Sequence, residues 1–311
     1  MGFAIPATQV VIMFGLIAFG WLAFRLRLVG AEAAKGMTNL LLYLISPAVI
    51  IQAFQRPFDA EKLRTVGWVF LLDVGAFLIS IALAHVLFPR RLVADDSKRR
   101  VLRFGLIYTN AGFLAIPLAQ ALLGDDGVFY AVAYLAVFNI FVWTHGVNQF
   151  GRDDTPWLRR VGTMLGNPNI IAIVVGLVLF VTSVRLPSPL FDVLGYLSGM
   201  NTPLSMIVIG VTLAEYSLRT VFTDGLVWWG TVARNLLVPL IFVGLLWMLP
   251  LDHAARMSML ISISAPVGAT LVIFSVKHGR HPEFASRLLS VSTLVSVLTL
   301  PAVIYLAGLL W

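Results

Sequence analysis

Apolar stretches about 20 residues long recur along the whole chain, and they place it in a membrane. A bilayer core of roughly 30 Å is crossed by about 20 residues of helix, which satisfies its own backbone hydrogen bonds in lipid. We therefore predict an all-α polytopic membrane protein with ten transmembrane helices. The expected spans lie near 5–25, 37–55, 66–88, 101–123, 127–149, 162–184, 191–213, 225–249, 256–277 and 285–310.

Composition supports this class and excludes others. The chain is 59% hydrophobic and 12% charged, against about 25% charged residues in a typical soluble domain. The first apolar run is too long for a signal-peptide core, so we expect it to be a retained span. The absence of cysteine excludes disulfides and thiol chemistry. The net charge of +7 does not require a nucleic-acid partner, because basic loops of a membrane protein explain it.

The distribution of lysine and arginine predicts the orientation in the membrane. Sixteen of the 22 fall in the odd-numbered loops between the expected spans, and five fall in the even-numbered loops. Cytoplasmic loops carry the excess of basic residues. We therefore expect the odd-numbered loops in the cytoplasm and both termini on the extracytoplasmic side.

The chain also carries an internal repeat with an offset of 156 residues, half of its 311. Five spans per half is an odd number, so the second half must enter the membrane in the opposite sense, as an inverted repeat. The expected units are residues 1–150, a short cytoplasmic linker 151–160, and residues 161–311. The pairs that define the offset are Gly112 with Gly268, Arg100 with Arg256, and Pro47 with Pro203.

Two corresponding spans are interrupted by helix-breaking residues near the middle of the bilayer. Asn110, Gly112 and Pro117 break the first, and Pro266 and Gly268 break the second. A lone membrane asparagine is most often a structural amide, but paired broken helices mark a transporter's binding site. Their half-helix N-termini suit an anion. The predicted substrate-binding residues are Asn110, Ala111, Gly112, Ala265, Pro266, Val267 and Gly268.

Other polar or broken positions permit two interpretations each. Ser46 with Pro47, and Asn201 with Thr202, are candidates for the scaffold side of the same cavity, or ordinary proline kinks. Asp73 and Arg234 are intramembrane charges, which normally face a cavity or a partner. They could form an ion pair, Asp73 could carry a coupling proton, or Arg234 could balance an anionic substrate.

No pattern indicates an enzyme. Nucleophile, phosphate-loop, dinucleotide and zinc-protease motifs are absent from the sequence, and His278 with His281 do not make a metal site by spacing alone. We predict no catalytic residues, no metal site and no cofactor, although transport could be coupled to protons or sodium.

Several motifs together resemble the auxin efflux carrier family, in a short-loop form typical of prokaryotes. The segment from Asn110 to Leu118 is similar to its fourth-helix motif. Its sixth helix is similar to 165–172, its seventh to 202–214, and its ninth to 265–266 together with 277–279. The likeness spans essentially the whole chain. It implies two inverted five-helix repeats with crossing broken helices four and nine, as in bile acid sodium symporters and sodium–proton antiporters.

The resemblance also implies roles for these parts. Helices 1, 2, 6 and 7 would form a scaffold that often dimerises, and helices 3–5 and 8–10 a moving transport unit. In plant members the crossover asparagine and the backbone beside the crossover proline bind the auxin carboxylate, and these roles map to Asn110 and Pro266. The linker Gly151 to Arg160 is short here, as in malonate-type permeases, which argues against auxin itself.

We therefore expect a transporter of a small organic anion, auxin-like or malonate-like, in the bacterial inner membrane. It would be secondary active or facilitative and would work by elevator-type alternating access. A sodium-coupled symporter and a non-transporting ligand sensor are the alternatives. The partners would be a carboxylate substrate, the lipid bilayer and a second copy of the chain.

Overall fold

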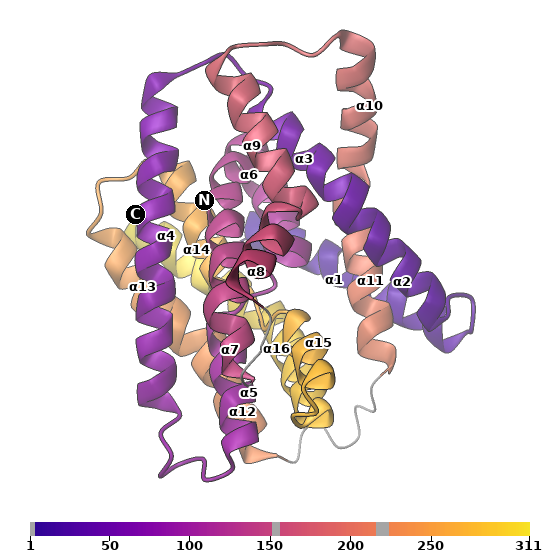
Figure 1. The fold of residues 1–311 in the computed structure, drawn as a ribbon, viewed down its shortest axis with the longest axis vertical. Coiled ribbons are helices and arrows are strands. Elements are labelled where there is room, and N and C mark those ends of the chain that lie inside the picture. The colour runs from indigo at the N-terminus through magenta and orange to yellow at the C-terminus, as the bar shows by residue number, and fades with distance from the viewer. Residues whose placement is uncertain (1–3, 151–155, 216–223) are drawn as a thin grey trace.

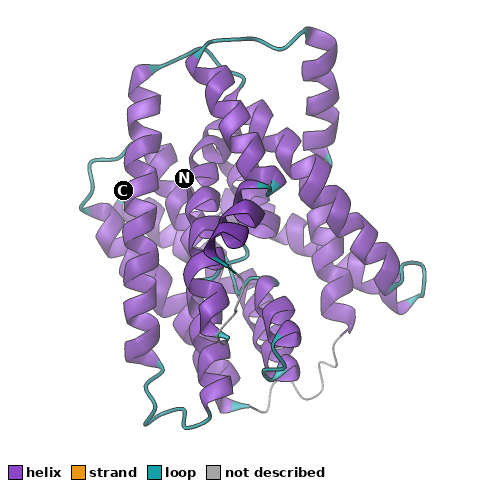
Figure 2. Ribbon diagram, in the orientation of Figure 1, coloured by secondary structure: helices purple, strands orange, loops and turns teal. Residues whose placement is uncertain are grey.

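Helices account for nearly all of the computed structural model, which describes residues 4–150, 156–215 and 224–311 (Figures 1 and 2). Within these residues, four of the helical segments are five-residue π-helical turns, at Leu41–Ile45, Ala111–Ala115, Val142–Gly146 and Ala233–Leu237. The α-helices are α1 (Ala4–Arg25), α2 (Ala31–Leu40), α3 (Ser46–Phe54), α4 (Ala60–Leu87), α5 (Asp96–Ile107), α6 (Ile116–Phe141), α7 (Val147–Gln149), α8 (Trp157–Leu165), α9 (Pro168–Val181), α10 (Ser188–Gly199), α11 (Asn201–Glu215), α12 (Gly225–Val232), α13 (Val238–Trp247), α14 (His253–Ser264), α15 (Thr270–Lys277) and α16 (Pro282–Leu310).

Seven helical segments within the described residues are long and apolar enough to cross a membrane, which confirms the predicted all-α polytopic class. The segment Ala111–Gln149 has 39 residues and covers parts of two predicted spans. It turns at Gly124, whose φ of 63° is a conformation that glycine adopts without strain. The seven segments are Ala7–Arg25, Ala31–Phe54, Ala60–Leu87, Ala111–Gln149, Ser188–Glu215, Gly225–Trp247 and Pro282–Leu310.

The other predicted spans correspond to shorter helices. The region 162–184 is not one helix, because α8 ends at Leu165 and α9 starts afresh at Pro168. The Asn167 side chain caps this new start by accepting from the backbone N–H of Asn169. The regions 101–123 and 256–277 are each divided by an unwound stretch, which leaves α5 and α14 with 12 residues each and α15 with 8.

Prolines explain three of the four π-helical turns. These turns end two residues before Pro47, Pro117 and Pro239. A proline inside a helix has no N–H for the preceding turn, and its ring collides with the carbonyl four residues earlier. The wider π-helical turn relieves that collision, and the helix continues.

Glycines allow two helix pairs to approach closely. A Cβ atom on Gly20 of α1 would collide with the Ile207 carbonyl of α11, and one on Gly210 would collide with the Ile17 carbonyl. A Cβ atom on Gly176 of α9 would lie 2.6 Å from the Phe54 ring of α3. The backbones of α1 and α11 are therefore in direct contact, and the backbone of α9 packs against the Phe54 ring of α3.

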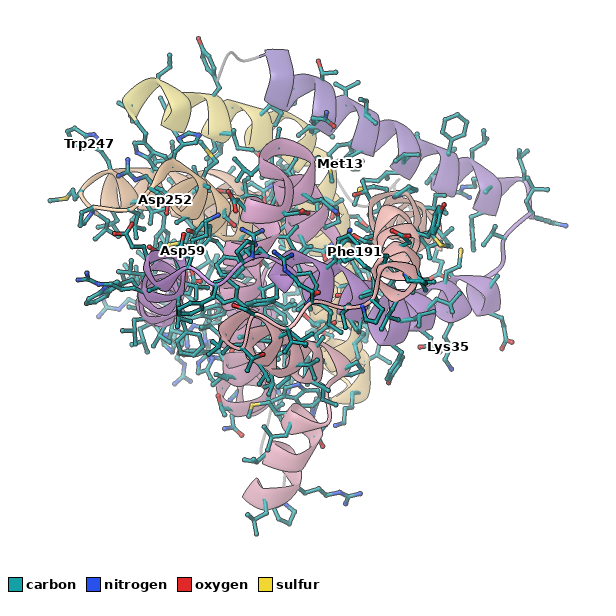
Figure 3. The ribbon with its side chains drawn as sticks, turned by 90° about the horizontal axis from the view of Figure 1, so that it is seen from above. Met13, Lys35, Asp59, Phe191, Trp247 and Asp252 are labelled. Carbon is teal, nitrogen blue, oxygen red and sulfur yellow. The ribbon has the colours of Figure 1, made fainter. Side chains whose placement is uncertain are left out.

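The helices pack as two groups that lie side by side, one of α1–α3 with α9–α11 and the other of α4–α6 with α12–α16. Figure 1 shows α2, α10 and α11 on one side of the molecule and α4, α12 and α13 on the other. In the view along the long axis, Lys35 of α2 and Trp247 of α13 mark opposite edges (Figure 3). Large apolar side chains such as Phe19, Leu71 and Leu298 are more than half exposed, as expected of surfaces that face lipid.

Several connections lie at the two ends of the long axis. The loop between α4 and α5 lies at the lower end of Figure 1, and the loops between α3 and α4 and between α9 and α10 lie at the upper end. The loop between α4 and α5 is an odd-numbered loop of the predicted topology, and the other two are even-numbered loops. The marked chain ends both lie in the upper half. Which end faces the cytoplasm stays a prediction.

Candidate functional site

Two unwound segments meet side by side in the interior and form what we call the crossover, residues 108–110 and 265–269. The first lies between α5 and the π-helical turn at Ala111, and the second between α14 and α15. Thr109 and Val267 pair as an isolated antiparallel bridge. Asn110 N–H donates to the Pro266 carbonyl at 2.8 Å, and Gly268 N–H donates to the Tyr108 carbonyl at 3.0 Å.

Proline and glycine give this pairing its form. Pro266 has no N–H, so it cannot return a bond to the Asn110 carbonyl. That carbonyl accepts instead from the N–H groups of Leu114 and Ala115, at 3.1 and 3.2 Å, and thereby starts the next helix. A Cβ atom on Gly268 would lie 2.6 Å from the Thr109 carbonyl oxygen, so only glycine permits this approach.

The first segment presents unused hydrogen-bonding groups. Asn110 is 6% exposed, and its side-chain amide makes no hydrogen bond within the described part of the chain. The N–H groups of Ala111, Gly112 and Phe113 belong to the first helical turn and pair with no carbonyl of the described residues. A Cβ atom on Gly112 would meet nothing within 4 Å, so there is free space beside this turn.

The second segment is held by neighbouring helices. Val267 N–H donates to Ser292 Oγ at 3.0 Å, and that hydroxyl donates to Asn235 Oδ1 at 2.7 Å. Asn235 Nδ2 returns a bond to the Ser292 carbonyl at 2.7 Å. Both side chains are buried. Sequence reasoning missed Ser292 and Asn235. Their only signal was a polar pair, Arg234–Asn235, in one apolar helix and several serines in another.

Arg234 is buried beside the same segment, and its partners are backbone carbonyls. Its guanidinium donates to Leu106 O at 2.7 Å, to Ala265 O at 3.0 and 3.1 Å, and to Ile263 O. These carbonyls belong to the last residues of α5 and α14 and the start of the second unwound segment.

Arg234 and Asp73 do not form an ion pair in this structure. Asp73 lies in the middle of α4 with no exposed surface, and neither carboxylate oxygen has a hydrogen-bond partner within the described residues. Phe77 lies one helical turn after Asp73 on α4, and its ring packs against Tyr108 of the crossover and against Tyr134. The Tyr134 hydroxyl accepts a hydrogen bond from Thr109 Oγ1 at 3.3 Å. Asp73 thus lies one turn from a contact with the crossover.

The candidate scaffold residues lie apart from these contacts. Ser46 and Asn201 are buried, Pro47 and Thr202 are partly buried, and no hydrogen bond within the described residues joins any of the four to the crossover. Gln120 of α6 does reach Ser198 of α10, with an Nε2–Oγ distance of 3.3 Å.

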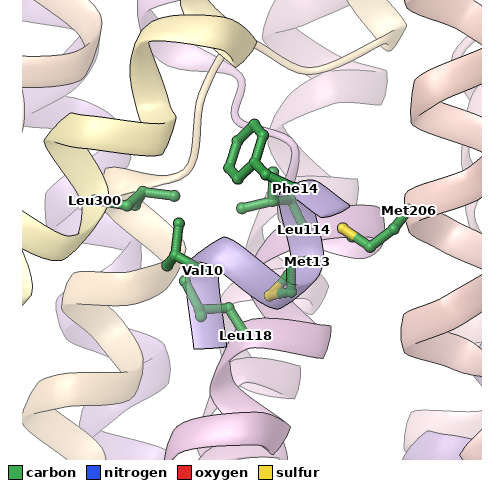
Figure 4. A pocket seen from close by; sticks show the side chains of 7 residues that line it. All are labelled: Val10, Met13, Phe14, Leu114, Leu118, Met206 and Leu300. Carbon is green, nitrogen blue, oxygen red and sulfur yellow. The ribbon is translucent and has the colours of Figure 1, made fainter. Parts of the chain in front are cut away.

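An apolar gap separates the two groups of helices beside the crossover (Figure 4). It has no room for a water molecule. Side chains from α1 and α11 meet side chains from α16 and from the helix that follows Asn110. The lining residues are Val10, Met13, Phe14, Leu114, Leu118, Met206 and Leu300.

The sequence matches a family model across both halves of this architecture. The model, described as "Membrane transport protein", covers residues 6–155 and 162–304. The chain belongs to this family. It is the auxin efflux carrier family that the crossover motifs resemble, and the protein is a membrane transporter rather than an enzyme.

Two relatives have similar lengths and distant sequences. A protein of Rhizobium meliloti named "Putative malonate transporter" is 25% identical over 307 residues, which cover 94% of this chain and 93% of that protein. An "Uncharacterized transporter" of Methanothermobacter thermautotrophicus is 23% identical over 287 residues, which cover 92% and 93%. Both therefore align with the unwound segments and the helices around them.

Proposed function

We propose that this transporter carries a small organic carboxylate, bound at the crossover beside Asn110. The observation that carries the proposal is the unused Asn110 amide, next to three unpaired N–H groups and the free space at Gly112. Buried polar groups in proteins are almost always hydrogen-bonded, so a set of unused donors in one place favours a ligand that accepts hydrogen bonds. The name of the Rhizobium relative supports malonate as the first compound to test.

Electrostatics favours an anion over a neutral ligand. The helices that leave the crossover start at Ala111 and at Thr270. Each helix N-terminus carries roughly half of an elementary positive charge, and no acidic side chain forms a hydrogen bond with these turns within the described residues. A carboxylate placed here would receive charge-assisted hydrogen bonds from the backbone and from the Asn110 amide.

The packing supports an elevator-type movement, in which a transport unit of helices 3–5 and 8–10 slides against a scaffold of helices 1, 2, 6 and 7, with both units drawn from two inverted repeats. Gly20 and Gly176 are 156 residues apart, and so are Phe54 and Gly210. The contact of Gly20 with α11 is therefore the repeat equivalent of the contact of Gly176 with α3. One group of helices is therefore tightly joined by equivalent contacts from both halves. The seven residues that line the gap are all apolar, so this part of the contact offers no hydrogen bond to resist sliding. Within the described residues, two amide contacts between the groups, Gln120 with Ser198 and Asn167 with Asn139, would have to break during the movement.

The test is uptake into proteoliposomes, with malonate and its neutral isostere malonamide as competitors. We expect labelled malonate to accumulate inside vesicles that contain the protein, and unlabelled malonate, but not malonamide, to inhibit it. Equal inhibition by malonamide would show that charge is not recognised. Binding in detergent without any uptake would identify a ligand sensor.

Asp73 is our candidate for proton coupling. Its carboxylate is buried and has no donor in the described part of the chain, and an unpaired charge in such surroundings is costly, so the group is suited to bind and release a proton during the cycle. In Asp73→Asn, which keeps the shape and removes the titration, we expect uptake to continue down a substrate gradient. Uptake driven by an imposed pH gradient should be lost. A variant that still responds to the pH gradient would exclude Asp73 from coupling.

A further inference from the structure

The carbonyls around Arg234 form a cage of the kind that binds a cation. Leu106 O, Ile263 O and Ala265 O come from two different half-helices and converge on one guanidinium. Hard cations such as sodium and potassium are held in proteins by the same oxygen ligands. The cage is closed to solvent, because Arg234 is only 1% exposed and Ala265 is fully buried.

The charge balance explains why a cation is needed there. Both α5 and α14 end at the crossover, and each helix C-terminus carries roughly half of an elementary negative charge. Two such ends together carry about one negative charge, which one guanidinium neutralises. The described part of the chain places no other cationic side chain in contact with these carbonyls.

A second observation concerns the same end of α14. The hydroxyl oxygens of Ser262 and Ser264, in its last turn, are buried and have no hydrogen-bond partner within the described residues. This helix end therefore carries more oxygen atoms than the two carbonyls that Arg234 uses there. A metal ion would draw its ligands from such a set.

We propose that Arg234 is a built-in substitute for a coupling metal ion. Its guanidinium permanently occupies the cation cage between the two half-helix C-termini, which leaves the two N-termini free to bind the carboxylate. This inference rests on the proposed function for its substrate. It predicts that carboxylate binding needs neither sodium nor potassium. It also predicts that removing the guanidinium creates a site for a small cation.

Arginine suits this role better than lysine. The planar guanidinium carries five N–H donors in a fixed arrangement, and four hydrogen bonds to the three carbonyls are present. A lysine ammonium is a point charge with three donors on a flexible stem. Arg234→Lys should therefore keep the charge of the cage and lose part of its geometry.

The first experiment uses the wild-type protein. Thermal unfolding of the purified full-length chain is measured with and without malonate in sodium chloride, potassium chloride and choline chloride at equal concentration. We expect the same malonate-induced shift in all three salts. A shift that requires sodium or potassium overturns the proposal. If malonate gives no shift in any salt, the proposed substrate is wrong, and the cage is decided by the second experiment.

The second experiment needs no carboxylate. Arg234→Ala is purified and unfolded in choline chloride, then with millimolar methylguanidinium or with sodium chloride in place of choline. We expect a lower melting temperature, raised by about 2–4 °C by either cation, because a ligand that binds only the folded state stabilises it. The wild type and Arg234→Lys should show no such increase.

Arg56→Ala is the matched control. Arg56 donates to the Ala53 carbonyl at 2.8 Å and pairs with Asp126, away from the crossover. Its loss opens no cage of helix ends, so neither cation should raise its melting temperature. If Arg234→Ala gains nothing from either cation, or cannot be purified even with methylguanidinium present throughout, the cage does not accept a substitute and the proposal is wrong.

Discussion

The two unwound segments of the crossover occupy equivalent positions in the sequence, yet their surroundings differ. The second segment is fixed by Ser292, by Arg234 and by the contact of Gly268 with the Thr109 carbonyl. The first contributes an amide and helix-start N–H groups without partners, beside free space at Gly112. One copy of the repeat therefore provides a rigid support, the second segment, which we call the frame. The other copy provides the groups that recognise the substrate.

The largest effect is expected from Gly268→Ala, in the frame. The new methyl group would lie 2.6 Å from a backbone oxygen, which cannot move aside without breaking the Gly268–Tyr108 hydrogen bond. We expect a loss of about 3 kcal/mol or more in stability, seen as little folded protein after detergent extraction. A Gly268→Ala protein that melts like the wild type would show that the two segments are not held as tightly as the structure indicates.

The next effect is expected on recognition rather than on stability. Asn110→Ala removes an amide that makes no hydrogen bond among the residues that the structure describes, so the melting temperature should change little. A hydrogen bond to a charged ligand contributes about 1.5–3 kcal/mol, so malonate affinity should fall roughly 10- to 150-fold. Isothermal titration of wild-type and variant protein measures this.

Asn139→Ala is the control for that prediction. Asn139 is a buried amide that accepts from Asn167 Nδ2 at 3.1 Å and donates to the Leu135 carbonyl at 2.8 Å. Its loss should lower the melting temperature and leave malonate affinity unchanged. If both variants behave alike, Asn110 is a structural amide as well.

Sequence analysis could predict the class of fold and the pairing of the two breaks, because both depend on residue type and spacing. Ten apolar runs indicate a helical membrane protein, and the offset between Gly112 and Gly268 indicates which breaks correspond. The partners of Arg234 could not be predicted, because they are backbone carbonyls, which every residue carries. Ser292 was missed for a related reason: a hydroxyl inside a membrane helix usually bonds its own backbone, as Ser286 does.

Ser292→Ala tests the frame with a smaller change. It leaves the Val267 N–H and Asn235 Oδ1 buried without their present partner, which costs about 1–3 kcal/mol. We expect a lower melting temperature with malonate affinity within a few-fold of the wild type. Ser286→Ala on the same helix removes only a bond to the Pro282 carbonyl, and it should be close to neutral. If Ser292→Ala and Ser286→Ala lower the melting temperature equally, Ser292 does not specifically support the second segment.

The smallest effect on stability is expected from Gly112→Ala, the repeat equivalent of Gly268→Ala. Its methyl group meets nothing within 4 Å, and alanine is favoured over glycine in a helix by about 1 kcal/mol, so the melting temperature should stay the same or rise. The methyl group would occupy the space that we assign to the carboxylate. Malonate affinity should therefore fall while the fold is kept. A Gly112→Ala protein with unchanged affinity would place the ligand elsewhere, and one as unstable as Gly268→Ala would show that the two segments are equivalent after all.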